Sequence, residues 1–175
     1  IGMGWPERFD VIEWIKLIIS WDSNAQIILH GVSMGAATVL MASGEELPEN
    51  VKAIIADCGY TSEWDEFKCE ANALHIPWFP VLNAASVLSR LRDGYDFKQA
   101  SALEQVKQSR IPTLFIHGSD DELVPYSMLD KLYSAAACEK ECLTVNGAGH
   151  ALSSSVEPEL YWNTVESFID KYLGK

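Results

Sequence analysis

The chain has 175 residues, of which 48% are hydrophobic and 22% charged, values that are ordinary for one globular domain with a real core. Its formal net charge of -12 argues against a nucleic-acid partner, because phosphate binding requires clustered Lys and Arg side chains. No apolar run has the length of a membrane span, and the first residues lack the features of a signal peptide, so the sequence slightly favours the cytoplasm.

The first predicted element is an amphipathic helix that begins at Pro6 and ends near Ser20, because its apolar residues recur at spacings of three and four. A short apolar run at 27–30 then breaks into Gly31-Val32-Ser33-Met34-Gly35, and an Ala-rich segment follows to about Ser43. This pattern predicts a strand, a sharp turn and a helix.

Such a turn holds Ser33 on strained backbone with its hydroxyl projecting, and we expect Gly31 and Gly35 to let strand and helix pack closely. The amide of Met34 lies at the helix start, where free N–H groups and the helix dipole stabilise negative charge. The motif therefore predicts a nucleophile beside one donor of an oxyanion hole. The alternative is an ordinary glycine-rich connection between a strand and a helix.

A second buried strand is predicted at 51–57, because its apolar residues are continuous, as in a parallel strand covered on both faces. Residues 60–100 then interrupt the alternation of strand and helix with aromatic side chains, prolines and small polar residues. We interpret this stretch as a cap-like insertion in which Trp78 and Phe79 shape an apolar pocket for the substrate. The alternative is a helical appendage that makes no contact with substrate.

The buried-strand pattern resumes at 112–117 and again at 142–145, with a predicted helix between them at 125–137 and a last helix at 156–173. Alternating strands and helices predict a parallel sheet in a three-layer α/β/α arrangement. We expect residues 1–175 to form one such domain.

A serine hydroxyl becomes a good nucleophile when a base accepts its proton and a third group orients that base. His150 follows the last strand at the edge of the sheet where the turn of Ser33 opens. Asp120, Asp121 and Glu122 follow the third strand at the same edge. The order of serine, acid and histidine is that of the α/β-hydrolase arrangement.

These motifs resemble those of the α/β-hydrolase superfamily, within it the serine hydrolases of the dienelactone-hydrolase and acylaminoacyl-peptidase-like group. The resemblance is carried by Gly31-Val32-Ser33-Met34-Gly35, by His117-Gly118-Ser119-Asp120-Asp121-Glu122-Leu123-Val124-Pro125, which is similar to the family's His-Gly-x-x-Asp-x-x-Val-Pro, and by Gly149-His150. It implies a catalytic triad of Ser33, Asp121 and His150 that requires no cofactor.

The chain departs from the family in length, because the resemblance implies a sheet of about eight strands and only four fit here. These four correspond to strands 5 to 8, so we expect a partial α/β-hydrolase fold, truncated at its N-terminus. The missing half carries the second oxyanion donor in the family. We also expect the unpaired edge of the strand at 27–30 to cause self-association or to pair with the missing half.

The leading functional hypothesis is a serine hydrolase that cleaves a small-molecule ester, or the amide of a peptide, through an acyl-enzyme. A hydrolase-like module that binds a ligand or partner without catalysis is the alternative. A metal site at Asp120, Asp121 and Glu122 is a weaker reading, because oxygen-ligand sites draw on more carboxylates at fixed spacing. The four cysteines lack zinc-binding spacing, and we expect buried thiols, with a pair between Cys138 and Cys142 as the alternative.

Overall fold

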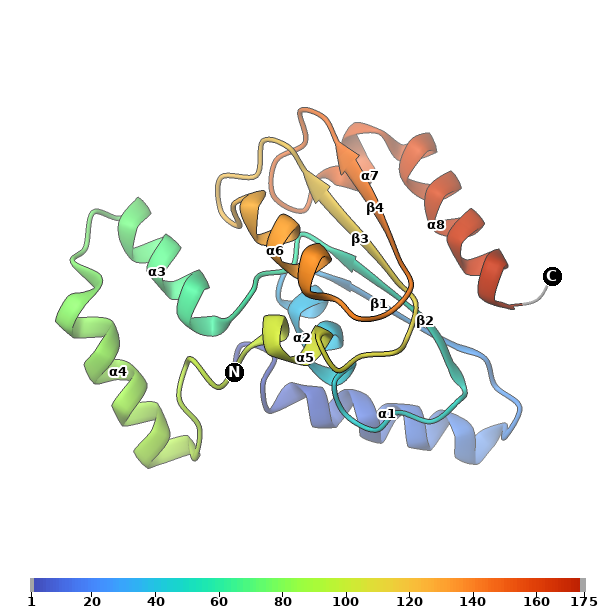
Figure 1. The fold of residues 1–175 in the computed structure, drawn as a ribbon, viewed down its shortest axis with the longest axis horizontal. Coiled ribbons are helices and arrows are strands. Elements are labelled where there is room, and N and C mark those ends of the chain that lie inside the picture. The colour runs from blue at the N-terminus through green and yellow to red at the C-terminus, as the bar shows by residue number, and fades with distance from the viewer. Residues whose placement is uncertain (1, 174–175) are drawn as a thin grey trace.

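The computed structural model describes residues 2–173, which form a sheet covered by helices on both faces (Figure 1). The sheet contains β1 (Ile27–Val32), β2 (Val51–Asp57), β3 (Thr113–Gly118) and β4 (Lys140–Val145) in that order, and every neighbouring pair is parallel. The predicted α/β architecture with a parallel four-stranded sheet is therefore confirmed.

Two groups of helices make the outer layers of the fold. One face is covered by α1 (Glu7–Trp21), α2 (Met34–Ala42), α5 (Ala102–Val106) and α6 (Ser127–Ala135), and the other by α7 (Ser153–Val156) and α8 (Pro158–Leu173). Strand β2 supplies both cores: Ile54 packs in the cluster that contains Leu40 of α2, and Ile55 packs with Phe168 of α8. Burial on both faces explains why the strand is continuously apolar.

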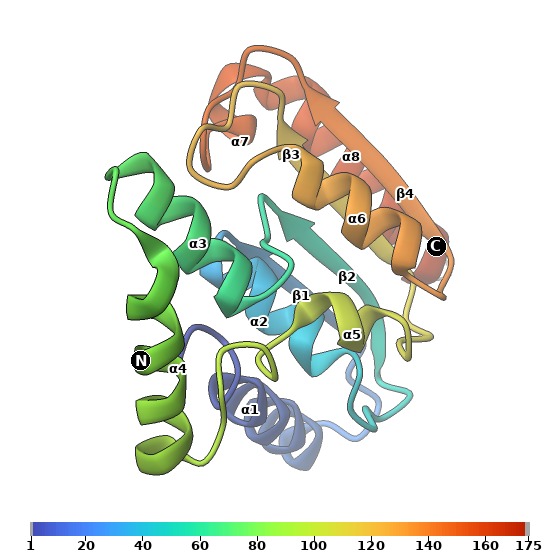
Figure 2. The same cartoon turned by 60° about the vertical axis from the view of Figure 1, so that its left-hand side comes forward.

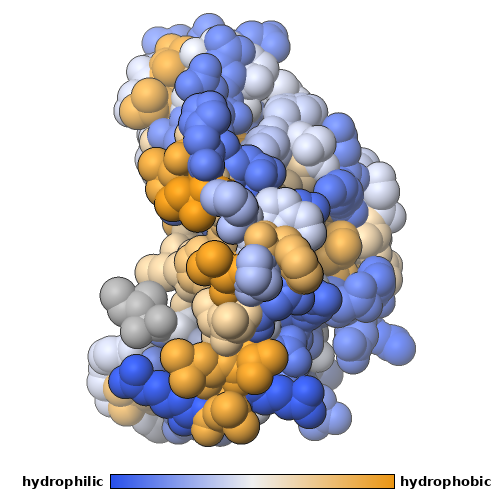
Figure 3. Space-filling model, turned by 90° about the vertical axis from the view of Figure 1, so that its left-hand side faces the viewer, coloured by the Kyte–Doolittle hydropathy of each residue, from blue (hydrophilic) through white to orange (hydrophobic). Residues whose placement is uncertain are grey.

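The insertion at 60–100 contains two helices, α3 (Glu63–Ala73) and α4 (Trp78–Asp93). They lie beside the edge where the strands end, and α4 is the outermost (Figures 1 and 2). The side of α4 that packs inward bears Leu82, Ser86 and Ser89, all buried. Apolar side chains stand on the outer surface of this side of the molecule (Figure 3); those of α4 are Phe79, Val81, Val87, Leu88 and Leu91.

Helix α5 and the start of β4 differ from the sequence-based expectation. Helix α5 has five residues, too few to show a helical period, although Ser101 caps it by accepting a hydrogen bond from the Glu104 amide. Strand β4 begins at Lys140 and not at Cys142, because this edge strand exposes polar residues that an apolar pattern does not reveal.

The cysteines also differ in part from expectation. All four are free thiols, and Cys58 is buried as expected, but Cys142 is exposed on β4.

Across residues 2–173, no helix combines the length and the apolar character needed to cross a membrane.

Candidate active site

Ser33 occupies the turn between β1 and α2 in a strained conformation, with φ of 55° and ψ of -119°. A positive φ is unusual for a residue with a side chain. The Ser33 amide donates to the Asp57 carbonyl oxygen at 2.8 Å, which ties the turn to the end of β2. The Ser33 hydroxyl faces the loop that carries His150.

The two glycines of the motif have different roles. A Cβ atom at Gly31 would lie 2.2 Å from the Gly35 carbonyl oxygen, so only glycine fits where the strand passes the helix. A Cβ atom at Gly35 would meet nothing within 4 Å. Among the described residues, close packing therefore requires glycine at position 31 and not at position 35. The expectation that both positions need glycine is wrong for Gly35.

The His150 imidazole lies between Ser33 and Asp121. Its Nε2 atom is 2.7 Å from Ser33 Oγ, and its Nδ1 atom is 2.9 Å from Asp121 Oδ2. The loop that carries it is held against the acid loop, because the Asp120 amide donates to the Ala148 carbonyl oxygen at 3.0 Å. The structure thus brings together three side chains that are 117 and 29 residues apart along the chain.

The Asp121 carboxylate is buried and fully hydrogen bonded. Its Oδ1 atom accepts from the amides of Leu123 and Val124 at 3.0 and 2.9 Å, while Oδ2 faces His150. Burial alone would raise the pKa of this carboxyl, but hydrogen bonds from His117, His150 and Val124 outweigh it and hold the pKa below its ordinary value. Asp121 is therefore ionised at neutral pH and stabilises a positive charge on His150.

His117 supports this acid, a role that the sequence analysis did not assign. Its side chain is buried, and Nε2 lies 2.9 Å from the Val124 carbonyl oxygen and 3.3 Å from Asp121 Oδ2. A carbonyl oxygen can only accept, so Nε2 must carry a proton. That proton is shared between the carbonyl and the carboxylate. The sequence feature that could have identified His117 is its position at the end of a buried strand, four residues before the acid.

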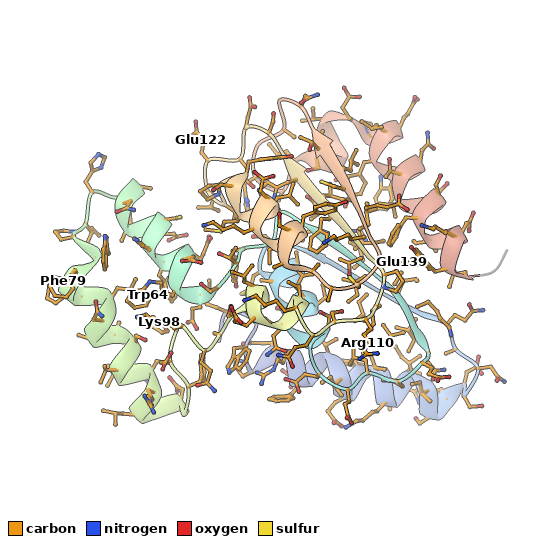
Figure 4. The ribbon with its side chains drawn as sticks, in the orientation of Figure 1. Trp64, Phe79, Lys98, Arg110, Glu122 and Glu139 are labelled. Carbon is orange, nitrogen blue, oxygen red and sulfur yellow. The ribbon has the colours of Figure 1, made fainter. Side chains whose placement is uncertain are left out.

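The neighbours of Asp121 point elsewhere. Asp120 is exposed and accepts from Ser119 Oγ at 2.6 Å. Glu122 is exposed and projects outward (Figure 4). Within the part of the chain that the structure describes, these three acids do not converge on a common point, and the metal reading based on them has no geometric support.

The Cys58 thiol is a further member of the site that sequence reasoning did not identify. The Cys58 sulfur, a carboxylate oxygen of Asp121 and a ring nitrogen of His150 all lie within 4.8 Å of one another. Sulfur, oxygen and nitrogen atoms of these side chains are the ligands that zinc prefers. Burial, with a smaller contribution from Asp57, raises the pKa of Cys58 to about 12, so the thiol is protonated. Because His150 and Asp121 are already hydrogen bonded to each other, we assign no metal to this group.

The remaining predicted residues are Met34, Trp78 and Phe79. Met34 is the first residue of α2, so its amide is among those that the helix leaves unpaired, next to Ser33. Trp78 packs on Trp64 with ring centroids 6.4 Å apart. Phe79 is 66% exposed and lies on the outer side of α4 (Figure 4), so the structure does not bring these two rings to Ser33. Their contact with substrate stays a prediction.

Comparison with known proteins gives three kinds of match. The model of the prolyl oligopeptidase family matches residues 6–175. The uncharacterized protein YqkD of Bacillus subtilis (strain 168) is 29% identical over 169 residues, which are 95% of this chain and 55% of YqkD. The lysophosphatidylserine lipase ABHD12 of Macaca fascicularis is 30% identical over 131 residues, which are 75% of this chain and 32% of the lipase.

Among solved structures, the esterase Pf2001 of Pyrococcus furiosus superposes with a TM-score of 0.74 at 19% identity, covering 98% of this chain and 64% of the esterase. At that identity the likeness demonstrates the fold. The chain spans about a third to a half of the length of the two sequence relatives.

Proposed function

Because this chain belongs to the prolyl oligopeptidase family, within the α/β-hydrolase superfamily, we propose that the protein is a serine hydrolase that cleaves carboxylic esters through an acyl-enzyme. The observation that carries the proposal is the pair of hydrogen bonds on His150, 2.7 Å to Ser33 Oγ and 2.9 Å to Asp121 Oδ2. Ionised Asp121 favours the proton on Nδ1, which leaves Nε2 free to accept the serine proton.

In the proposed reaction, Ser33 Oγ attacks the ester carbonyl carbon while its proton passes to His150 Nε2. The carbonyl oxygen becomes an oxyanion that the Met34 amide stabilises at the N-terminus of α2. The tetrahedral intermediate collapses as the alcohol leaves with the proton from His150, and the acyl group remains on Ser33. Water then repeats the sequence with His150 as base, which releases the carboxylic acid and restores the serine.

The choice of an ester over an amide rests on a relative. The name of ABHD12 describes a lipase, and lipases hydrolyse esters, whereas the family model is named for peptidases. An amine is a poorer leaving group than an alcohol. Cleavage of an amide would therefore depend more strongly on proton donation from His150 to the leaving nitrogen. We therefore propose esters as the main substrates and test amides in the same experiment.

The decisive experiment labels the complete protein that carries these residues with a fluorophosphonate and locates the adduct by peptide mass spectrometry. We expect one adduct per chain on Ser33, no adduct in Ser33→Ala, and full labelling in Ser20→Ala, which removes an exposed serine hydroxyl remote from the site. Rates on p-nitrophenyl esters of increasing length, with a peptide p-nitroanilide alongside, then rank ester against amide. Absence of an adduct and of turnover would favour a module that binds without catalysis.

A further inference from the structure

Asp57, the last residue of β2, touches both the nucleophile turn and the segment behind the base. Its backbone carbonyl oxygen accepts from the Ser33 amide at 2.8 Å. Its carboxylate, on a residue only 2% exposed, accepts from Ser153 Oγ at 3.2 Å. Burial and, after it, the nearby Asp57 charge raise the pKa of the Tyr161 phenol. The mechanism above uses none of these side-chain contacts.

The two hydroxyl groups belong to the helices that follow the His150 loop. Ser153 is the first residue of α7, three positions after His150, and is fully buried. Tyr161 lies on α8, is 1% exposed, and its hydroxyl is also 3.1 Å from His30 Nε2 on β1. Two residues separate His150 from Ser153, and one of them, Ala151, has a left-handed φ of 57°. Because so few residues connect them, the position of His150 depends on the position of Ser153.

The chemistry of the group explains why these bonds are directional. A buried carboxylate is costly unless hydrogen bonds replace its water. Burial raises the pKa of Asp57, and the hydroxyls of Ser153 and Tyr161 partly offset that shift. The Ser153 hydroxyl can donate its single proton to the carboxylate in one orientation. This bond therefore orients α7 relative to the end of β2.

We propose that Asp57 is a positioning residue that sets the separation of Ser33 and His150, acting on the histidine through Ser153. The inference rests on the proposed hydrolase function. Its carbonyl holds the nucleophile turn and its carboxylate holds the segment that carries the base, so a single residue keeps both within hydrogen-bonding distance.

Removing either side of the side-chain contact lowers the turnover number. Asp57→Asn and Ser153→Ala each reduce kcat on p-nitrophenyl acetate by about 10- to 100-fold, because small displacements of reacting groups cost rates of this order, while KM changes little. The matched control is Ser43→Ala, which removes an equally buried hydroxyl bonded to Leu40 at the far end of α2 and keeps the parent kcat.

A second set of variants separates positioning from general damage to the fold. In a His150→Ala background, Ser153→Ala leaves the residual rate of ester hydrolysis unchanged within twofold, because the serine acts only through the missing imidazole. A serine with a merely structural role lowers the residual rate in that background as well, together with the melting temperature.

The inference is overturned by parent kcat values in Asp57→Asn and Ser153→Ala, or by a further loss of rate when Ser153→Ala is added to His150→Ala. Failure of the proposed function gives a different result: Ser33→Ala retains the parent rate and the parent protein takes up no fluorophosphonate.

Discussion

Asp120 and Asp121 carry the same side chain one position apart, and their surroundings differ. Asp120 is exposed and bonded to a surface hydroxyl, whereas the carboxylate of Asp121 is buried and contacts His117 and His150. Loss of the negative charge therefore matters at one position only. At residue 121 an amide would present a donor to His150 and favour the tautomer that protonates the wrong nitrogen.

We expect Asp121→Asn to lower kcat by about a thousandfold to ten-thousandfold, as the loss of the acid does in the serine protease triad. Asp120→Asn is the matched control and should stay within twofold of the parent protein. Steady-state hydrolysis of p-nitrophenyl acetate measures both, with circular dichroism to establish that each variant is folded. A large loss in Asp120→Asn with a mild effect in Asp121→Asn would show that Asp120, and not Asp121, is the triad acid.

The first turn of helix α3 contains two buried acids that have no cationic partner in residues 2–173. Glu63 and Glu66 are 3% and 4% exposed, and one carboxylate oxygen of each lacks a hydrogen bond in the described chain. Burial raises the pKa of both to about 7, with nearby Glu7 and Asp93 adding to the shift at Glu63, and Glu70 and Asp121 adding to it at Glu66.

These shifts predict how stability depends on pH. A carboxyl whose pKa is higher in the folded chain than in the unfolded chain stabilises the fold below about pH 4.5, and that stabilisation is lost as pH rises through about 7. Glu66→Gln mimics the protonated acid, so it should raise the melting temperature by a few degrees at pH 8 and by clearly less at pH 5. Scanning calorimetry at both pH values measures this. Glu166→Gln, at an exposed position of α8, is the control; equal melting temperatures for Glu66→Gln and the parent at pH 8 would contradict the prediction.

The helix pair α3 and α4 also provides a test of the cap. Phe79 is 66% exposed, and removal of an exposed side chain usually changes stability by no more than about 0.5 kcal/mol. If the cap contacts the acyl chain, Phe79→Ala should change the ranking of p-nitrophenyl esters from acetate to octanoate while the melting temperature stays constant. Leu91→Ala, at an 80% exposed position further along α4, serves as the control. An unchanged ranking would leave the insertion as a packing appendage.

Elements and residues differed in how far the sequence predicted them. The strands were predictable because burial on both faces makes them continuously apolar, and Ser33 because its turn requires a recognisable pattern. The contact of Asp57 with Ser153 joins residues 96 positions apart and leaves no periodic signal. His117 likewise supports Asp121 through a side-chain orientation that only the packed loop determines. Local sequence patterns thus reveal helices, strands and special turns. Hydrogen bonds between residues far apart in the chain can be identified only in the three-dimensional structure.

At the scale of the whole molecule, the two edges of the sheet are unlike. Strand β1 pairs only with β2 within the described residues, and β4 pairs only with β3. The edge at β4 bears Lys140 and Glu141, charges of the kind that discourage pairing with another chain. Strand β1 bears Ile27, Ile28 and Leu29 instead. An apolar edge strand with unpaired amides and carbonyls favours association with a further strand.

We propose that a further strand pairs with β1 in the complete protein, and we predict that the 175-residue chain expressed alone self-associates with rising concentration. Multi-angle light scattering should show a mass that increases with concentration for this chain and a constant mass for the complete protein. Ile28→Lys should suppress the association, because an edge lysine opposes pairing. Leu91→Lys replaces an 80% exposed apolar side chain on α4, away from the β1 edge, and should leave the association unchanged. If Leu91→Lys suppresses association as strongly as Ile28→Lys, general surface hydrophobicity and not the β1 edge drives it; a constant monomer mass for the isolated chain would show that β1 needs no partner.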